Sequence, residues 1–364
     1  MKHLIFIIGD DIIINKDYKK YIFRKYEEKF KEIQEIKILS KTDKDLPFIL
    51  EKIIKKYDFI TIFSSYEHYH IVAKIISTIN DDNLVLKEDT LVPDKALEFA
   101  KNSSLNLVND TKINLLKVSV EEKLPKLLGE IELNFDYFCI FDMDEDSVKI
   151  LLQTITKSYE IDIKTSFILS NLTLVKAQAL QYGQLKSFMQ GVEKIFDSKF
   201  MIGNDPINFI VKKLLDQNLK ISFAESCTGG MCANEITKID GISKIFDGSI
   251  ISYSNKIKHE WLGVSESILE NNGEYSERCM YFMLKGIFKT AKPDFAIAIS
   301  GVAGSEDIAN IKSGTIFIGA MYKDGTYLQE ILNLKGDRIY IKKQAVIASF
   351  CLLLKLKPHF FNLG

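Results

Sequence analysis

The sequence contains little proline and glycine, with only 6 Pro and 19 Gly among 364 residues. Collagen-like repeats and low-complexity linkers are rich in these residues, so neither is expected here. Long hydrophobic runs are also missing. The longest apolar stretch, residues 345–354, falls short of the roughly 18–20 residues that a membrane helix needs, and it is better explained as a core helix. We therefore expect no membrane partner.

An excess of charge of one sign is absent as well. The chain has 48 Lys and Arg against 49 Asp and Glu, which gives a formal net charge of −1. Binding of nucleic acid usually needs a clustered excess of basic residues, so no nucleic-acid partner is expected. The five cysteines form no CxxC pair and are odd in number. A chain of this length does not depend on disulfides, so we expect a reducing, cytoplasmic environment.

The N-terminal residues 1–11 resemble a signal peptide only superficially. Their apolar run is short and ends in Asp10 and Asp11, without a small-residue cleavage site. This segment is typical of a buried strand followed by a turn.

Short apolar runs alternate with longer amphipathic ones along most of the chain, and 364 residues suit two or three domains. Such alternation predicts βαβ units and parallel sheets. We therefore expect an α/β protein of two three-layer α/β/α domains with mostly parallel sheets, joined by a small connecting subdomain. The expected domains are residues 1–160, 161–202 and 203–364, with the last boundary at the turn before Pro206.

The expected elements follow from hydrophobic periodicity. In the first part, strands are expected at residues 4–8, 36–39, 59–63 and 137–141, and helices at 18–30, 48–56 and 147–156. The connecting segment is predicted to hold a strand at 167–169 and a helix at 180–196. The last part is predicted to hold strands at 221–224, 249–253, 295–300 and 315–322, and helices at 206–216, from 228 onward, at 276–290 and at 339–356.

The most informative stretch is Glu-Ser-Cys-Thr-Gly-Gly at residues 225–230, which follows an apolar strand and precedes a helix. Open α/β sheets bind ligands at such strand ends. Two glycines let a ligand approach the backbone, and the N–H groups of a helix start suit an oxyanion or a phosphate. The alternative is that Thr228 caps the helix while the glycines permit close packing. The residues alone favour neither reading.

Several ordered motifs resemble those of the CinA family. AESCTGG at 224–230 resembles the signature of its C-terminal domain, which also occurs alone as the nicotinamide-nucleotide amidase PncC. Further similar pieces follow in the family's order: GSIISYSN with Lys258 for GG-x-x-x-YSN-x-x-K, LGV at 262–264, GEYSE at 273–277 for GAVSE, SGVAG at 300–304 for SGIAGP, GT at 314–315, and GDR at 336–338. The resemblance covers residues 206–356 and implies hydrolysis of nicotinamide mononucleotide to nicotinate mononucleotide and ammonia.

The resemblance also implies roles for individual residues. Ser226 would be the nucleophile and Lys258 its base, provided that burial or a nearby cation lowers the lysine pKa, with Tyr253 relaying or orienting the proton. Cys227 is a rival nucleophile, because a thiol at a helix N-terminus acquires a lower pKa. Adjacent turn residues usually point apart, which favours the serine. Without the motif, Lys258 would be interpreted as a surface lysine and Tyr253 as a packed strand residue.

The substrate needs further contacts besides the nucleophile and base. Arg338 can bind the phosphate through two hydrogen bonds, although a helix-start ion pair is its alternative. The backbone N–H groups of the turn could cradle the phosphate or the oxyanion, and the end of the strand at 295–300 could line the pocket. The expected substrate-binding residues are Cys227, Thr228, Gly229, Gly230, Ser300, Gly301 and Arg338. For Glu225 we expect no role beyond orienting Lys258 electrostatically.

Two regions depart from the family pattern. After Gly304 the family continues with proline and a glycine-rich stretch, whereas this chain has SEDIANIKSG at 305–314. The start of the chain, with Gly9 and Asp10, resembles a MoaB-like domain, but SSYEHYH at 64–70 replaces its glycine-rich phosphate loop. Side chains there would crowd a pyrophosphate away from the backbone. We therefore expect a degenerate MoaB-like domain.

Cofactor and partner expectations follow from the same residues. The amidase would need no cofactor, and a divalent metal would matter only if the N-terminal domain hydrolysed ADP-ribose. The acids at 142 and 144–146 and the pair His68 and His70 are better explained as a solvated segment and a helix surface than as metal ligands. The resemblance implies a homodimer acting on a small nucleotide. The alternatives are a nucleotide-binding regulator that has lost catalysis, and an ADP-ribose pyrophosphatase.

Overall fold

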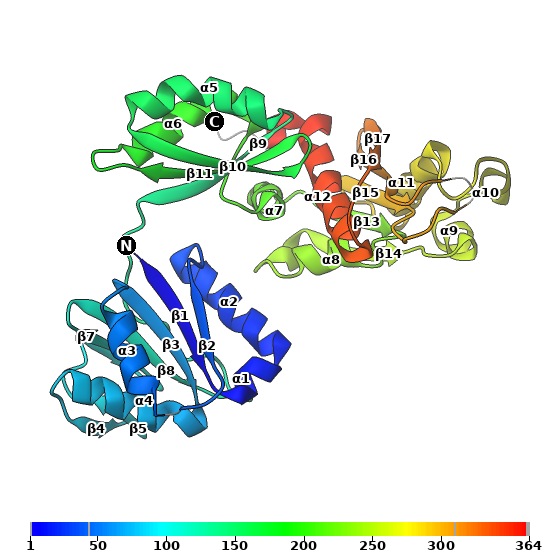
Figure 1. Cartoon of the computed structure of the whole chain (residues 1–364). Coiled ribbons are helices and arrows are strands. Elements are labelled where there is room, and N and C mark those ends of the chain that lie inside the picture. Colours follow the sequence, from blue (N-terminus) through cyan, green and yellow to red (C-terminus); the bar gives the residue numbers. More distant parts are fainter. Residues whose placement is uncertain (1, 43, 309–310, 362–364) are drawn as a thin grey trace. The chain divides into compact units, whose positions relative to one another are not determined.

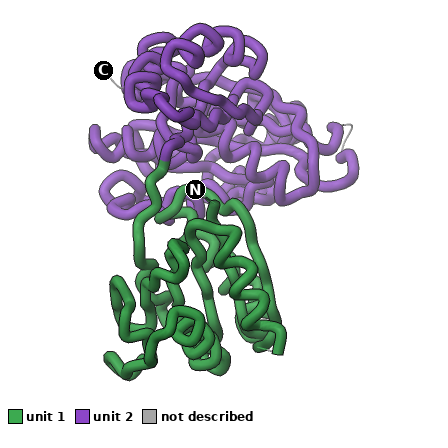
Figure 2. Tube along the Cα trace, turned by 60° about the vertical axis from the view of Figure 1, so that its left-hand side comes forward, with its two compact units in different colours: residues 1–133 green, residues 134–364 purple. Residues whose placement is uncertain are grey.

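The computed structural model describes residues 2–42, 44–308 and 311–361. The chain forms two compact units, Met1–Leu133 and Asn134–Gly364, which Figure 2 shows in separate colours. Each unit has its own hydrophobic clusters. None of the helices in the described part of the chain combines the length and the apolarity that a bilayer span requires.

The first unit is built on a six-stranded sheet. Its strand order is β2 (Ile36–Leu39), β1 (His3–Ile8), β3 (Phe59–Ser65), β8 (Thr111–Val118), β7 (Ser103–Val108) and β6 (Glu98–Ala100). The first four strands pair in parallel and the last two are antiparallel additions. Every residue of β1 and β3 is buried, as their continuous apolar sequences require in a sheet covered on both faces.

Helices cover both faces of this sheet. One face packs against α1 (Asp10–Ile14) and α2 (Lys16–Phe30), and the other against α3 (Leu46–Ile54) and α4 (Tyr66–Ile79). A separate hairpin is formed by β4 (Leu84–Lys87) and β5 (Thr90–Pro93). The three-layer arrangement expected from the sequence is thus confirmed for the first unit.

The second unit begins with a small antiparallel sheet. Its order is β10 (Ile161–Leu169), β11 (Leu172–Ala179), β9 (Phe135–Phe141) and β12 (Phe200–Ile202), and α5 (Glu145–Ser158) and α6 (Leu185–Phe196) pack on one face. The sequence analysis placed β9 and α5 in a first domain ending at residue 160. In the structure these elements belong to the second unit, because β9 hydrogen-bonds to β11 and β12.

The main sheet of the second unit has five strands. Their order is β14 (Phe246–Ile251), β13 (Ile221–Glu225), β15 (Phe295–Gly301), β16 (Thr315–Tyr322) and β17 (Tyr327–Asn333). The first three are parallel and the last two antiparallel. One face packs against α7 (Pro206–Asp216), α8 (Met231–Ile236) and α12 (Arg338–Leu356), and the other against α9 (Asn255–Leu262), α10 (Glu266–Asn272) and α11 (Glu277–Ala291). This confirms a second three-layer α/β domain.

Helix α12 lies between the small sheet and the five-stranded sheet in Figure 1. Residues of the small sheet, among them Phe141 and Leu172, belong to the same hydrophobic cluster as α12 and β13. Both sides of this helix are therefore buried along much of its length, which explains its nearly uniform apolar sequence from Ala345 to Leu356. The described residues of the second unit also form short 3₁₀ turns at Asp197–Lys199, Ile242–Lys244 and Pro358–Phe360.

Candidate active site

Three parallel strands end side by side in the second unit. Glu225, the last residue of β13, pairs with Ile251 of β14 on one side and with Ile299 of β15 on the other. The segments that leave these strands therefore meet at one edge of the sheet, where α/β domains bind ligands. They bring together Ser226, the Ser252–Tyr253 segment and the Ser300–Gly301 segment.

Ser226 and Lys258 are in hydrogen-bond contact at this edge. The distance from Lys258 Nζ to Ser226 Oγ is 3.1 Å, and Nζ also donates to the Ser252 carbonyl at 2.8 Å and to the Tyr253 carbonyl at 3.4 Å. Lys258 lies on α9, whose first turn is capped by the Ser254 side chain. The structure therefore places the predicted nucleophile and base next to each other.

The Lys258 side chain is buried, with only 1% of its surface exposed. Burial disfavours the ammonium form and lowers the pKa of Lys258, while the nearby Cys279, Glu274 and Cys227 act in the opposite direction. A lysine with a lowered pKa has more of the neutral amine near neutral pH, which is the form that can accept a proton. The alternative reading, a surface lysine, is therefore wrong for this residue.

Cys227 differs from its neighbour Ser226. Its side chain belongs to the large hydrophobic cluster beneath the turn, together with Phe223 and Cys232. Burial raises the pKa of Cys227 to about 12, although Lys342, Arg338 and Lys258 pull it down. The thiol is therefore protonated near neutral pH, and the lowered pKa expected from a helix start is outweighed by burial. The geometry favours Ser226 as the nucleophile.

Glu225 holds the turn between β13 and α8 by hydrogen bonds and does not contact Lys258 through its carboxylate. Its buried carboxylate accepts hydrogen bonds from Thr228 Oγ1 at 2.8 Å, Ser249 Oγ at 3.2 Å, and the backbone N–H groups of Gly230, Cys232 and Ala233 at 3.0–3.2 Å. A carboxylate at the start of α8 satisfies N–H groups that have no partner within the helix. Sequence analysis missed this role.

The turn donors are only partly available to a ligand. Gly229 N–H donates to the Ser226 carbonyl and Gly230 N–H to Glu225, so these two expected donors are engaged. In the described part of the chain, neither Cys227 N–H nor Thr228 N–H has a hydrogen-bond acceptor in another residue. Positive φ angles of 60° and 91° at Gly229 and Gly230 delay the helix, which begins at Met231 and not at Thr228 as predicted.

Tyr253 faces outward, with 61% of its surface exposed. Its hydroxyl accepts a hydrogen bond from Arg338 Nη2 at 3.0 Å, whereas its carbonyl, not its phenol, contacts Lys258. Arg338 begins α12, where Asp337 caps the helix. The observed contacts thus join the Tyr253 hydroxyl to Arg338, while only its backbone carbonyl contacts Lys258.

Two further charged residues reach the site and were not singled out by sequence analysis. Lys342 lies one helical turn after Arg338, and a Cβ at Gly229 would be 3.6 Å from its Nζ. Glu274, in the loop before α11, is close enough to Lys258 to raise the pKa of its ammonium. The sequence contained an indication of each residue. Lys342 lies four residues after Arg338 and so on the same side of a helix, and Glu274 stands where the family motif GAVSE has alanine.

Ser300 and Gly301 shape the third side of the site. Ser300 is buried, and its Oγ donates to the Glu274 carbonyl at 3.1 Å, so it holds that loop rather than facing open space. Gly301 has a φ of 145°, and a Cβ there would approach the Thr315 carbonyl to 2.5 Å. Only glycine fits this close passage of two strands.

The unusual segment after Gly304 folds back on itself. Ile308 and Ile311 form a backbone bridge, Ser313 N–H donates to Asp307 at 2.8 Å, and the Ser313 hydroxyl donates to the Gly304 carbonyl. Residues 309 and 310 lie outside the described residues. A Cβ at Gly304 would be 3.7 Å from Arg338 Nη1, so this segment reaches the mouth of the site.

Four of the other sequence candidates have structural partners. Asp144 caps α5, Glu145 pairs with Lys149, and Asp142 lies near Lys199 and Lys355. His68 contacts Thr42. Among the described residues, no group of three or more His, Cys, Asp or Glu side chains is arranged to hold a metal ion. In the first unit β3 passes directly into α4, and a Cβ at Gly9 would meet the Ser65 side chain at 2.5 Å.

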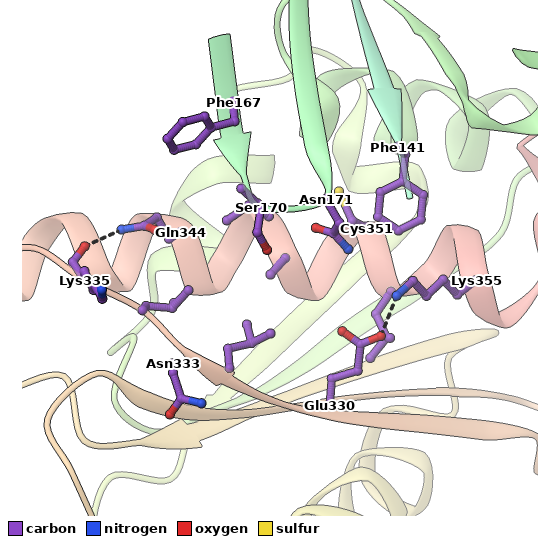
Figure 3. A pocket seen from close by; sticks show the side chains of 15 residues that line it. Phe141, Phe167, Ser170, Asn171, Glu330, Asn333, Lys335, Gln344, Cys351 and Lys355 are labelled. Atoms are coloured by element: carbon purple, nitrogen blue, oxygen red, sulfur yellow. Dashed lines mark hydrogen bonds and ion pairs between the residues drawn. The ribbon is translucent and has the colours of Figure 1, made fainter. Parts of the chain in front are cut away.

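A cavity of about 400 Å³ also lies in the second unit, away from Ser226 and Lys258. Figure 3 shows it between the β10–β11 turn, β17 and α12, with the Glu330–Lys355 ion pair at one end and the hydrogen bond from Gln344 to the Lys335 carbonyl at the other. At the Ser226 site, a hydroxyl and an amine are in contact at the edge of the sheet. The cavity is lined largely by apolar side chains, and none of its lining residues forms a comparable pair of nucleophile and base.

The fold and the site together define a three-layer α/β domain with a serine hydroxyl in contact with a buried lysine amine where three parallel strands end. Residues 204–357 match the profile of the CinA C-terminal domain. The nicotinamide-nucleotide amidohydrolase PncC of Enterobacter agglomerans is 42% identical over 130 residues, which are 35% of this chain and 79% of that protein. The chain belongs to the CinA family and has a PncC-like C-terminal domain.

Longer relatives also match part of this chain. The CinA-like protein of Thermosipho melanesiensis is 35% identical over 166 residues, or 45% of this chain and 41% of that protein. The CinA-like protein of Fervidobacterium nodosum is 36% identical over 162 residues, or 44% and 40%. The match thus spans about two-fifths of the length of these relatives. A CinA-superfamily structure from Klebsiella pneumoniae has 26% identity and a TM-score of 0.41, and covers 43% of this chain and 99% of its own.

Proposed function

We propose that this chain hydrolyses the carboxamide of nicotinamide mononucleotide to nicotinate mononucleotide and ammonia, with Ser226 as the nucleophile. The observation that carries the proposal is the 3.1 Å contact between Ser226 Oγ and the buried Lys258 Nζ. The substrate is suggested by the name of the PncC relative, of which this chain covers 79%. An amide is a poor electrophile, so its cleavage needs an activated nucleophile, and the chain offers one here.

The proton path follows from this contact. Neutral Lys258 accepts the Ser226 hydroxyl proton as Oγ attacks the amide carbon, which forms a tetrahedral intermediate. The resulting ammonium donates that proton to the leaving nitrogen, so ammonia departs and an acyl-serine ester is left. Lys258, neutral again, then takes a proton from water as the water attacks the ester. Collapse of the second intermediate returns the proton to Ser226 Oγ and releases the carboxylate product.

The developing oxyanion needs donors that are fixed before the reaction begins. Cys227 N–H and Thr228 N–H lie directly after the nucleophile, and neither has an acceptor in another described residue. Glu225 holds the turn that carries both groups. We assign these two N–H groups to the oxyanion. The sequence suggested the N–H groups of Thr228, Gly229 and Gly230, so Thr228 is retained and Cys227 takes the place of the two glycines.

The substrate phosphate is assigned to the start of α12. Arg338 and Lys342 lie one turn apart there, and both are close enough to the turn to lower the pKa of Cys227. Arg338 is oriented by Tyr253, whose hydroxyl it contacts at 3.0 Å. A guanidinium and an ammonium together suit a phosphate dianion. Nucleophile, base and donors all come from the chain, so the proposed reaction requires no cofactor.

The deciding experiment is ammonia release from nicotinamide mononucleotide by the purified full chain. We expect Ser226→Ala to lower kcat by roughly a thousandfold or more, since it removes the attacking atom. Cys227→Ala, the matched neighbour, is expected to keep activity within about tenfold, because only the buried thiol is lost.

Other results would redirect the assignment. Binding of the nucleotide without ammonia release would support a regulator that has lost catalysis. Loss of activity in Cys227→Ala but not in Ser226→Ala would make the thiol the nucleophile. Cleavage of ADP-ribose with added divalent metal, unaffected by Ser226→Ala, would place chemistry in the first unit.

A further inference from the structure

Charged groups flank the nucleophile from opposite faces of the sheet. Arg338 and Lys342 approach from α12, which packs on one face. Glu274 approaches from the loop between α10 and α11, which pack on the other face. The proposed phosphate position accounts for the two cations, but nothing in the proposed chemistry uses the carboxylate.

Glu274 is held in place at two points. Its carbonyl accepts from Ser300 Oγ at 3.1 Å, which ties the loop to the end of β15. Its carboxylate accepts from Asn255 Nδ2 at 3.3 Å, on the same helix as Lys258. The side chain is half-buried. The backbone of Glu274 is therefore tied to β15, and its carboxylate contacts the helix that carries Lys258.

This carboxylate lacks a cationic partner in the working form of the site. Among the described residues, no lysine, arginine or histidine forms an ion pair with Glu274. Lys258 is the cation whose charge Glu274 influences, and it must be neutral to accept the Ser226 proton. The carboxylate is thus a negative charge without a counter-charge among the described residues, and a cationic group of the ligand would be attracted to it.

An aromatic ring stands next to this carboxylate. Tyr275 follows Glu274 and is half-buried against the cluster around Leu262. Burial raises the pKa of Tyr275, and the charge of Glu274 acts in the same direction. The ring next to this carboxylate offers a surface that attracts a flat cation. In the family motif quoted above, GAVSE, these two positions are alanine and valine.

We propose that Glu274 and Tyr275 form a subsite for the positively charged pyridinium ring of the substrate, so that this chain selects zwitterionic pyridine nucleotides over uncharged analogues. This rests on the proposed function and adds a specificity determinant to it. The phosphate binds Arg338 and Lys342, the carboxamide lies at Ser226, and the ring nitrogen carries the charge that Glu274 neutralises. Once that charge is in place, the carboxylate no longer favours the ammonium form of Lys258.

Two nucleotides that differ in ring charge test this subsite. Nicotinamide mononucleotide has a cationic ring, whereas dihydronicotinamide mononucleotide keeps the carboxamide and the phosphate on a neutral ring. The protein is the full chain with Ser226→Ala, so that neither ligand is turned over, and affinities are measured by calorimetry. We expect the cationic nucleotide to bind roughly tenfold more tightly, a factor typical of one partly buried charge contact.

The ratio of the two affinities is the readout for Glu274. Adding Glu274→Gln should bring the ratio close to one by weakening only the cationic ligand, while the unchanged affinity for the neutral ligand shows that the site is still folded. Glu277→Gln, an exposed residue three positions along the chain, removes the same charge away from the site and should leave the ratio unchanged.

Each remaining outcome counts against a defined claim. Equal affinities for the two nucleotides in the Ser226→Ala protein, or a ratio that survives Glu274→Gln, would overturn the pyridinium subsite while leaving the amidase proposal intact. Failure of the Ser226→Ala protein to bind either nucleotide, together with absence of ammonia release by the unmodified chain, would overturn the proposed function and the subsite with it.

Discussion

Lys258 is subject to opposing influences at the scale of a single side chain. Burial lowers its pKa, whereas Glu274 from the α10–α11 loop, Cys279 from α11 and Cys227 from the turn raise it. Burial is the largest of these and decides the direction. The only hydroxyl in contact with its Nζ is that of Ser226 among the described residues. Burial thus favours the neutral amine of a lysine whose Nζ contacts this serine hydroxyl.

The direction of this shift predicts the pH dependence of the reaction. In the proposed mechanism the neutral amine of Lys258 is the active form. The value of kcat/KM should therefore rise with pH and become constant above the pKa of Lys258, which lies below the ordinary lysine value of 10.5. Lys258→Arg should be inactive over the whole range, because a guanidinium does not lose its proton in proteins. The measurement is the pH profile of ammonia release between about pH 5 and 10.

The lowered pKa of Lys258 also makes folding stability increase with pH, in the same direction as the predicted activity. Because the folded-state pKa lies below the unfolded one, the unfolded chain binds more protons between the two values, and stability increases with pH across that window. A profile that falls with pH on its acid side would contradict Lys258 as the base. An active Lys258→Arg variant would do so as well.

Sequence reasoning succeeded at this scale where a residue belongs to a local motif. Ser226 and Lys258 were predicted from ordered motifs, and the structure brings them into contact. Lys342 and Glu274 were missed because their relation to the site depends on how α12 and the α10–α11 loop pack against opposite faces of a sheet. The reduced reactivity of Cys227 was also beyond the sequence, since burial outweighs its place before a helix.

At the scale of elements, the turn between β13 and α8 depends on one carboxylate. Helix α8 has six residues, too few to be stable by itself. Glu225 compensates by accepting hydrogen bonds from three N–H groups at its start and from two hydroxyls. The same turn carries Ser226, so the geometry of the nucleophile depends on this buried acid.

Glu225→Gln should therefore destabilise the protein and impair catalysis together. The amide has one acceptor oxygen where the carboxylate has two, and its NH2 group would face N–H donors. We expect a loss of about 2–4 kcal/mol in the free energy of unfolding, measured in urea, and a lower kcat. Glu235→Gln, on the same helix and in a surface pair with Lys238, is the matched control and should cost less than about 1 kcal/mol. Equal effects of the two substitutions would contradict the role given to Glu225.

Element boundaries were predictable where side chains set them. Pro206–Asp216 and Thr315–Tyr322 match the prediction, because a proline at a helix start and an apolar strand are local signals. The strand predicted at 249–253 is found at Phe246–Ile251. Strand β11, directly before the predicted helix at 180–196, was not predicted. Pairing with neighbouring strands decides both, and one sequence read alone does not contain that information.

At the scale of the whole chain, hydrophobic burial is divided between the two units. The two clusters of the first unit contain residues from within 1–133 only. The three clusters of the second unit contain residues from within 134–364 only. The small sheet is different, since Cys139, Phe141, Leu169, Leu172 and Met201 belong to the same cluster as α7 and α12. The small sheet thus shares the core of the second unit and is not an independent connector.

This division predicts how truncation affects the protein. A fragment of residues 134–364 should fold and keep the amidase activity of the full chain within about twofold, because it loses no member of its own clusters. A fragment of residues 203–364 should be strongly destabilised, since removal of the small sheet exposes the apolar face of α7 and α12 that Phe141 and Leu172 cover. Thermal unfolding and ammonia release of the two fragments provide the comparison. If the shorter fragment were as stable and as active as the longer one, the small sheet would be dispensable and the shared cluster would not hold the domain together.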